Sequence, residues 1–421
     1  MSHSESAMPR LLAGVSGARP VDHAQHLRLH GALPESLPGL IDQLARAGLR
    51  GHGGGGFPFA RKLEAVSGRR GRPIVVVNAT EGEPLSAKDK LLLTHTPHLV
   101  IDGALAAAAV LGAREVVIAA ESGAAVAAVD SALAQRPRGR RERVEVSVQM
   151  VSGGYLAGQE TALIAALSGR EALPMLTPPY PFERGLRGRP TLVSNAETYA
   201  QAALIARHGA SWFRALGTAQ SPGTRLITLS GAVSRPGVIE VAGGSSIAAA
   251  LLAAGGASEP LQGILLGGYA GVWAGPEAQS WQLGESELRA RGATLGPGIV
   301  HVLGSSGCPV DSTAHAVRWL HEESAGQCGP CVNGLDAIAC SLEELRGDGD
   351  RSGAFAHLER WCSLITRRGA CALPDGAARL VTSALRSHRA AFEQHARYGG
   401  CEACAGRSGV RAARQRAGVA A

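Results

Sequence analysis

The stretch "GLRGHGGGGFPFARKL" (residues 48–63) has five glycines among positions 51 to 56, and its interpretation decides the fold. Glycine loses more conformational freedom on folding than any other residue, so such a run persists where the backbone needs φ > 0 or approaches another group closely. Two interpretations compete: a flexible linker, and a cradle whose backbone N–H groups converge on a phosphate. Linkers are usually Gly/Ser mixtures with polar flanks, whereas an aromatic–proline pair follows this run. The cradle is therefore favoured.

The run does not form a conventional dinucleotide fingerprint. Gly51, Gly53 and Gly56 spell G-x-G-x-x-G, but that fingerprint follows a strand and opens a helix. Here the preceding residues 36–48 have apolar side chains at helical spacing, and Pro58 follows too soon. We therefore expect no conventional Rossmann turn at this place.

Length and composition limit the class of protein. A chain of 421 residues that is 45% hydrophobic can bury a large core and is expected to form two to four domains. The first residues lack the apolar core of a signal peptide, and no apolar run reaches transmembrane length, so we expect a cytoplasmic protein. Eight cysteines, several closely spaced, favour metal or redox ligands over disulfides. The net charge of +7 favours acidic partners only mildly, and we expect no nucleic-acid partner.

Lysine is rare and clustered. Only three of the 42 Lys and Arg residues are lysine, namely Lys62, Lys88 and Lys90. A chain this rich in Arg keeps Lys where a compact ammonium on a flexible stem cannot be replaced by a planar guanidinium. The cluster therefore points to a site beside the glycine run, with chance clustering as the alternative.

The residues after the glycine run alternate predicted strands and helices. Strands are expected over residues 72–80, 114–120 and 143–151, separated by helices that begin at Thr96–Pro97 and at Ser122. This βαβαβ pattern predicts an α/β fold with a largely parallel sheet. Ligands of such sheets usually bind beyond the carboxyl ends of the strands.

The texture changes twice further along the chain. From about residue 220, short predicted strands, a Pro-Gly turn and one helix indicate a small β-rich domain. From about residue 301 the pattern is helical and contains all eight cysteines. Residues 405–421 carry four Arg and no acidic residue, and are expected to be disordered, with anion binding as the second interpretation.

Polar motifs follow the predicted strands. Asn78, Glu81 and Glu83 come directly after the first strand, "YLAGQETAL" (155–163) follows the third, and "GRPTLVSNAET" (188–198) is a third polar segment. A solvated turn is the plain explanation of each motif. Together they mark the edge of the sheet where an α/β ligand would bind.

In this order, the motifs resemble the family of flavin- and NADH-binding (51 kDa type) subunits of respiratory complex I, and related subunits of NAD-linked hydrogenases and formate dehydrogenases. The resemblance covers about residues 45–395. It implies an α/β, Rossmann-like FMN-binding domain, then a small ubiquitin-like domain of the β-grasp, SLBB type, and a C-terminal helical bundle. The expected divisions are an N-terminal segment (1–45), the FMN- and nucleotide-binding domain (46–220), the ubiquitin-like domain (221–300), the helical iron–sulfur-type domain (301–400), and a Cys-x-x-Cys and basic tail (401–421).

The resemblance also implies which residues hold ligands, while the flavin itself carries the chemistry and no side chain is catalytic. FMN would be held by Gly51, Gly53, Gly54, Gly56, Lys62, Asn78, Glu81, Gly158, Glu160, Ser194, Asn195 and Thr198. NADH would contact Phe57, Glu83 and Tyr180. A [4Fe–4S] or incomplete cluster would be held by Cys328, Cys331 and Cys371.

The cluster motif departs from that family. The family motif is E-S-C-G-x-C-x-P-C, but residues 323–331 of this chain read "ESAGQCGPC", so Ala325 replaces the first cysteine. A full cluster normally has four thiolate ligands. Three outcomes stay open: a substitute ligand, a three-iron form, or loss of the cluster.

The other cysteines have competing interpretations. Cys308, or the pair Cys401 and Cys404, is a candidate for the substitute ligand. Otherwise Cys308, Cys340 and Cys362 are expected to be small apolar residues of the core. The pair Cys401 and Cys404 is separately a candidate metal or redox pair.

The nucleotide-binding motifs depart as well. Thr80 stands where the family has Asp, Gln159 where it has Glu, Thr177 where it has Lys, and Tyr180 where it has Phe. The loss of two carboxylates makes the pocket less negative, which is expected to favour the anionic reduced flavin and to raise its potential. FMN binding is therefore better supported than specificity for NADH.

The sequence thus predicts an NADH dehydrogenase-like, FMN-dependent electron-transfer oxidoreductase. Electrons would move between NADH and an iron–sulfur or ferredoxin partner, while the protein positions the flavin and tunes its potential. One alternative is a flavoprotein that exchanges electrons with a ferredoxin without NADH. The other is a non-catalytic binding or assembly module that has kept the fold, which the colour of the purified protein would distinguish.

Overall fold

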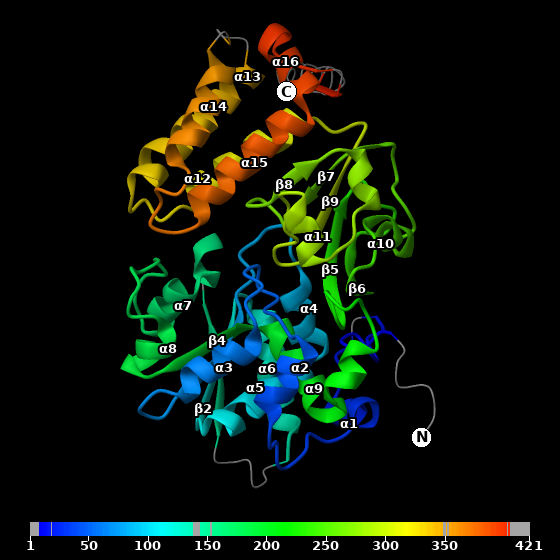
Figure 1. The fold of residues 1–421 in the computed structure, drawn as a ribbon, viewed down its shortest axis with the longest axis vertical. Helices are drawn as coiled ribbons and strands as arrows, with labels where there is room; N and C mark the ends of the chain where they lie inside the picture. The colour runs from blue at the N-terminus through cyan, green and yellow to red at the C-terminus, as the bar shows by residue number, and fades with distance from the viewer. Residues whose placement is uncertain are drawn as a thin grey trace, which may run out of the picture.

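The computed structural model describes residues 8–17, 19–137, 144–151, 154–347, 351, 353–401 and 403–404. Three parts are visible in Figure 1: an α/β part, a small β-rich part beside it, and a helical bundle at the far end from the first helices. Residues 405–421, with their expected disorder, lie outside the described residues.

The α/β part contains one parallel sheet of four strands. The strands are β1 (Ile74–Ala79), β2 (Glu115–Ala120), β3 (Glu145–Met150) and β4 (Thr191–Asn195), in the order β3-β2-β1-β4. Three of them lie within the segments predicted to be strands, and the predicted parallel sheet is confirmed. Their carboxyl ends lie along one edge of the sheet, where ligands of such folds bind.

Both faces of this sheet are covered. Successive strand residues point to opposite faces, so Val75 and Val77 join one buried cluster and Ile74 and Val76 join another. The first face is covered by α2 (Leu40–Ala47), α3 (Phe59–Ser67), α4 (Lys88–His95), α5 (Pro97–Leu111), α6 (Gly123–Gln135) and α9 (Ala196–Arg214). The second face is covered by α7 (Glu160–Leu167) and the segment around Leu186. The helices α1 (His23–His30) and α8 (Pro181–Arg184) lie at the periphery.

Local signals explain where two of these helices begin. The Ser122 hydroxyl accepts from the Ala125 N–H at 3.3 Å and caps α6, as its sequence position predicts. Thr96 occupies the N-cap position of α5, but its hydroxyl donates to the Leu92 carbonyl at 3.4 Å and caps nothing. Pro97 alone therefore marks the start of α5.

The second part is a mixed sheet of five strands. It contains β5 (Thr224–Gly231), β6 (Gly237–Ala242), β7 (Leu261–Leu266), β8 (Val272–Ala274) and β9 (Ile299–Gly304), in the order β6-β5-β9-β7-β8. The central pair β5 and β9 is parallel and the other pairs are antiparallel. The helix α10 (Ile247–Ala253) connects β6 to β7, and α11 (Glu285–Ala290) precedes β9. This topology is the ubiquitin-like β-grasp that the resemblance implied.

The third part is a bundle of helices. It contains α12 (Pro309–Glu322), α13 (Asp336–Arg346), α14 (Ala354–Ile365), α15 (Leu373–Ser387) and α16 (Arg389–Tyr398), with a π-helical turn at Pro330–Leu335. Their apolar faces share one buried core. The bundle also contacts the β-grasp sheet: the backbone N–H of Trp273 in β8 donates to the Ser383 hydroxyl in α15 at 2.9 Å.

Among the described residues, no single helix is long and apolar enough to cross a membrane. The pair α4 and α5 meets the length and composition requirement only when taken together, and the two helices are bent by 96° at the break between them.

Candidate functional site

A cavity of about 650 Å³ lies at the carboxyl ends of β1 and β4, and all three parts of the chain contribute to its wall. Of the ligand-binding residues proposed from the sequence, the wall contains Gly51, Gly53, Gly54, Gly56, Phe57, Lys62, Asn78, Glu81, Glu83, Gly158, Glu160, Ser194, Asn195 and Cys371. The wall does not contain Thr198, Tyr180, Cys328 or Cys331. The structure therefore brings residues from five separate segments to one cavity.

The glycine loop presents bare backbone to this cavity. Gly54 and Gly56 have φ values of +107° and +58°, which residues other than glycine rarely adopt. A Cβ on Gly56 would lie 2.8 Å from the nearer carboxylate oxygen of Glu285, and a Cβ on Gly53 would lie 3.3 Å from the Cβ of Asn195. The loop is thus packed closely between the β-grasp domain and the end of β4.

His52 anchors the beginning of the glycine loop to the start of α9. Its N–H donates to the Thr198 hydroxyl at 3.0 Å, and its ring Nδ1 lies 3.1 Å from a carboxylate oxygen of Glu197. Arg50 adds a hydrogen bond of 2.8 Å to the Gly56 carbonyl. A loop held at these points is unlike a flexible linker, and Thr198 serves to hold it.

Beneath the loop lies a buried network of charges around Lys88. The ammonium is fully buried and lies 2.8 Å from Asp89, 2.9 Å from Asn195 and 3.2 Å from Glu197. Burial alone would lower the pKa of Lys88, but Asp89 and Glu197 outweigh it and the pKa is raised. Burial likewise opposes ionisation of Glu197, yet His52 and Lys88 hold the pKa of that carboxyl at about 2. The Lys88 ammonium and the Glu197 carboxylate are therefore both charged at neutral pH.

Two polar residues at the cavity are largely occupied by the protein itself. The Glu81 carboxylate accepts from the Asp89 and Lys90 N–H groups at 3.1 and 3.0 Å, so it caps the start of α4. Burial raises the pKa of Glu81. The Asn195 amide oxygen accepts from Lys88 and from the Glu197 N–H. These two side chains shape the cavity more than they offer free hydrogen-bonding groups to it.

Lys62 and Glu160 present a cation and an anion at the cavity wall. The Lys62 ammonium pairs with the Glu160 carboxylate and donates to the Val193 carbonyl at 3.0 Å. The two side chains are 27% and 41% exposed, so both can reach a ligand. The Asn78 amide donates to the Gly158 carbonyl at 2.8 Å and joins the first and second polar motifs.

The residues proposed for NADH divide in two groups. Glu83 is buried beside the β-grasp domain, where it accepts from the Tyr269 N–H at 3.0 Å, and burial raises its pKa to about 7. Phe57 is half exposed at the cavity. Tyr180 stacks on Phe182, with ring centroids 5.5 Å apart, and is not part of the cavity wall.

The three proposed cluster ligands come from two neighbouring segments, the π-helical turn with the residues before it and the loop before α15. The sulfurs of Cys328 and Cys331 lie 3.6 Å apart, and Cys371 lies in the cavity wall. Burial raises the pKa of the Cys328 thiol, but hydrogen bonds from the backbone of Ala370 and Cys331 outweigh it and leave the pKa lowered. The Ala370 bond places the loop of Cys371 beside that of Cys328.

Ala325, at the place of the missing thiol, packs against the core of the helical bundle and offers no ligand atom. The side chains present therefore suit an iron–sulfur centre with three thiolates from these loops.

Of the three remaining cysteines expected in the core, only Cys340 needs correction. Cys362 is buried in the bundle, as expected of a core residue. Cys340 is exposed, because it lies on the side of α13 that faces Arg318 and solvent, so its prediction as a core residue was wrong. Cys308 is buried, but its sulfur lies 3.3 Å from the ring of His395, a neighbour that spacing did not reveal.

Models of three protein families match this chain. Residues 44–204 match the Nuo51 FMN-binding domain, residues 226–266 match the SLBB domain, and residues 311–395 match the NADH-ubiquinone oxidoreductase-F iron–sulfur binding region. The three matches follow the order of the three parts of the fold. Together with the cavity they define the class: an oxidoreductase subunit that binds a flavin and an iron–sulfur centre.

Relatives with curated names identify the family within that class. The F subunit of NADH-quinone oxidoreductase in Rhizobium meliloti (strain 1021), the copy numbered 2, is 33% identical over 383 residues, which cover 87% of this chain and 91% of that protein. The F subunit of NADH-quinone oxidoreductase in Mycobacterium tuberculosis (strain ATCC 25618 / H37Rv) is 32% identical over 394 residues, which cover 89% of this chain and 88% of that protein. The chain belongs to the family of NADH-quinone oxidoreductase F subunits, and its predicted class, an NADH dehydrogenase-like flavin oxidoreductase, is confirmed.

Solved structures show the same fold. The structure titled "Crystal structure of NAD+-reducing [NiFe]-hydrogenase in the air-oxidized state" contains a chain that matches with a TM-score of 0.79 and 30% identity. The match covers 86% of this chain and 63% of the hydrogenase chain. The chain therefore spans less than two thirds of that hydrogenase chain. The H2-reduced state of the NAD+-reducing [NiFe]-hydrogenase gives a TM-score of 0.79 at 28% identity.

The Lys88 network leads to a prediction about stability. Lys88→Ala removes the cation that compensates two buried carboxylates, and breaking a buried ion pair costs about 3–5 kcal/mol. We expect the free energy of unfolding, measured with urea and followed by circular dichroism, to fall by about that amount. Lys90→Ala is the matched control, because Lys90 is exposed and surface substitutions change stability by less than about 0.5 kcal/mol. Equal stability of the two variants would show that the network does not stabilise the fold.

Proposed function

We propose that this chain uses FMN to move electrons between NADH and an iron–sulfur or ferredoxin-like partner protein. The observation that carries the proposal is the shared cavity wall. Cys371, a proposed cluster ligand, lines the same cavity as the glycine loop and Lys62. A flavin bound in that cavity would therefore lie next to a proposed ligand of the iron–sulfur centre.

The cavity suits FMN in size and in chemistry. Its volume of about 650 Å³ falls within the usual range for cofactor pockets, roughly 300–1,000 Å³. The bare backbone of the glycine loop allows a flat ring or a phosphate to approach closely, and Lys62 supplies a cation. When bound, FMN supplies the redox chemistry by exchanging electrons with nicotinamide and with iron–sulfur centres. The chain's residues bind it, orient it and set its electrostatic surroundings.

The proposed FMN contacts are those sequence candidates that line the cavity. Lys62 and Glu160 are partly exposed and reach into it, whereas Asn78, Glu81 and Asn195 fix its shape through hydrogen bonds within the protein. Thr198 acts indirectly, since it holds His52 of the glycine loop. Gly51, Gly53, Gly54, Gly56, Gly158 and Ser194 contribute backbone or small surfaces of the wall.

The proposed NADH contacts at the cavity are Phe57 and Glu83. Phe57 offers a half-exposed ring at the cavity, on which a nicotinamide can stack. Glu83 lies at the same cavity with a pKa of about 7, so its charge changes near neutral pH. Tyr180 stacks on Phe182 outside the cavity wall and, being half exposed, stays a proposed NADH contact beyond that wall.

The names of the relatives support the partners. The curated relatives are NADH-quinone oxidoreductase subunits, and the solved structures are NAD+-reducing hydrogenases. We propose a cytoplasmic protein that works with an iron–sulfur protein or subunit. Cys328, Cys331 and Cys371 would hold the iron–sulfur centre through which electrons leave or enter the chain.

An anaerobic titration with NADH tests this function. We expect purified yellow-brown protein to lose its flavin absorbance as NADH is added, and the reduced protein to pass electrons to an added ferredoxin. Reduction by dithionite but by neither NADH nor NADPH would support the alternative flavoprotein that uses a ferredoxin without NADH. Colourless protein that takes up no FMN would support the non-catalytic module and would contradict the proposal.

Lys62 provides a test of the flavin site. A charge-assisted hydrogen bond contributes about 1.5–3 kcal/mol, so Lys62→Ala is expected to weaken FMN binding roughly ten- to a hundredfold. FMN retained after gel filtration, measured by absorbance and fluorescence, reports the loss. Arg61→Ala is the matched control, because Arg61 is the adjacent, exposed cation and does not line the cavity. Full retention of FMN by Lys62→Ala would place the flavin elsewhere.

Ala325 provides a test of the iron–sulfur site. Ala325→Cys restores the thiol of the family motif beside Cys328 and Cys331, so iron per chain is expected to rise towards four in anaerobically purified protein. Iron and acid-labile sulfide assays measure the change, with Ala325→Ser as the control that adds no thiol. An iron content of four already in the unaltered chain would mean that another group completes the cluster.

A further inference from the structure

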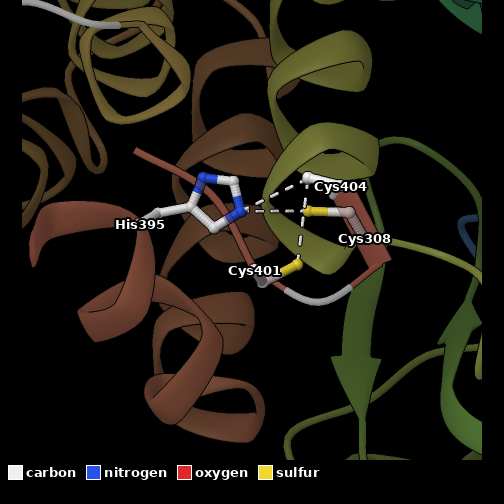
Figure 2. A group of neighbouring side chains, drawn as sticks. All are labelled: Cys308, His395, Cys401 and Cys404. Carbon is white, nitrogen blue, oxygen red and sulfur yellow. Dashed lines mark hydrogen bonds between the residues drawn. The ribbon is translucent and has the colours of Figure 1, made fainter. Parts of the chain in front are cut away.

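Three cysteines and one histidine converge at the junction of the β-grasp domain and the last helix. Figure 2 shows the side chains of Cys308, His395, Cys401 and Cys404 pointing towards one another. One possible ligand atom of each lies within 4.8 Å of all the others. Among the described residues, no other set of His, Cys, Asp and Glu side chains meets this condition.

Three of the six separations among the four ligand atoms match the edges of a tetrahedron around one ion. Zinc binds thiolate sulfur at about 2.3 Å and imidazole nitrogen at about 2.0–2.1 Å, so tetrahedral ligands lie about 3.8 Å (S to S) and about 3.5 Å (S to N) apart. The Cys401 and Cys404 sulfurs lie 3.8 Å apart, and His395 Nε2 lies 3.3 Å from Cys308 Sγ and 3.6 Å from Cys404 Sγ.

The groups around the four side chains also suit a metal. His395 Nδ1 lies 3.1 Å from the Leu345 carbonyl, and this hydrogen bond orients the ring and leaves Nε2 free to coordinate. The Asp311 N–H donates to Cys308 Sγ at 3.3 Å, as N–H groups do towards metal-bound thiolates. Both partners come from helices that pack against α16, so the site is supported on two sides.

Chain segments far apart in the sequence supply the ligands. Cys308 stands between β9 and α12, His395 lies in the last turn of α16, and Cys401 and Cys404 follow the left-handed Gly399 that ends this helix. Cys308 and His395 are buried, with exposed fractions of 0% and 1%. Four protein ligands leave no open position, which is typical of a structural metal site.

We propose that Cys308, His395, Cys401 and Cys404 bind one Zn²⁺ ion in a closed Cys3His site that fastens α16 and the residues after it to the start of α12. Binding of the ion displaces the thiol protons to water, and no electron is transferred. The site is separate from Cys328, Cys331 and Cys371, and it does not depend on the proposed flavin chemistry.

Metal analysis of the full chain tests the proposal. Protein purified without chelators or a polyhistidine tag is expected to contain about one zinc per chain by mass spectrometry of the metals, besides any iron and flavin. Cys401→Ser/Cys404→Ser is expected to lower zinc at least fivefold while iron and FMN per chain stay unchanged. Cys340→Ser is the matched control, because Cys340 is exposed and lies outside this set, and it is expected to keep its zinc.

A second measurement needs no substitution and so does not depend on how a variant folds. Unaltered protein grown with cobalt in place of zinc is expected to show thiolate-to-cobalt charge transfer and the visible bands of tetrahedral cobalt. Unaltered protein free of zinc after growth with zinc would overturn the proposal. So would zinc retained by Cys401→Ser/Cys404→Ser, or iron lost from that variant in place of zinc.

Discussion

The buried ammonium of Lys88 is the interaction on which the cavity depends. An ion removed from water loses several kcal/mol of solvation, so a fully buried Lys persists only where oxygen atoms replace the water. Here Asp89, Asn195 and Glu197 supply them. Glu197 then extends the network to His52 of the glycine loop. It also accepts a hydrogen bond of 2.8 Å from the Leu226 N–H of β5. One set of charges thus fixes the loop, the end of β4 and the β-grasp domain relative to one another.

This arrangement explains how a loop of five glycines forms a defined surface. Such a loop gains little from its own side chains and loses much conformational entropy. His52 provides the anchor, because its backbone and ring both bond to the start of α9. The glycines themselves add no side chains to the part of the cavity wall that they form. The bonds of His52 to α9 therefore order the loop, while its glycines allow a ligand in the cavity to approach the backbone closely.

The parts that the sequence predicts are those set by local patterns. Strand 114–120 and the helix capped by Ser122 follow from apolar runs and a capping residue, and the structure has them within a residue or two. The residues of the cavity were proposed from the family resemblance, because which motifs lie side by side depends on the order of the strands in the sheet. The partners of Lys88 were not predicted, since Glu197 is distant in sequence and a buried charge has no periodic signal. Tyr180, proposed for NADH from the resemblance, stacks on Phe182 two residues further along the same segment and does not line the cavity.

The two Cys-x-x-Cys pairs show why spacing alone does not identify a metal site. Cys328 and Cys331 have sulfurs 3.6 Å apart and Cys401 and Cys404 have sulfurs 3.8 Å apart, so the pairs are alike locally. Their further neighbours differ, because the first pair lies near Cys371 at the cavity wall whereas Cys308 and His395 complete the second. Zinc has no redox chemistry. A zinc ion at the second pair would fasten the last helix without adding a competing electron acceptor to a protein whose proposed electron path runs through the first pair.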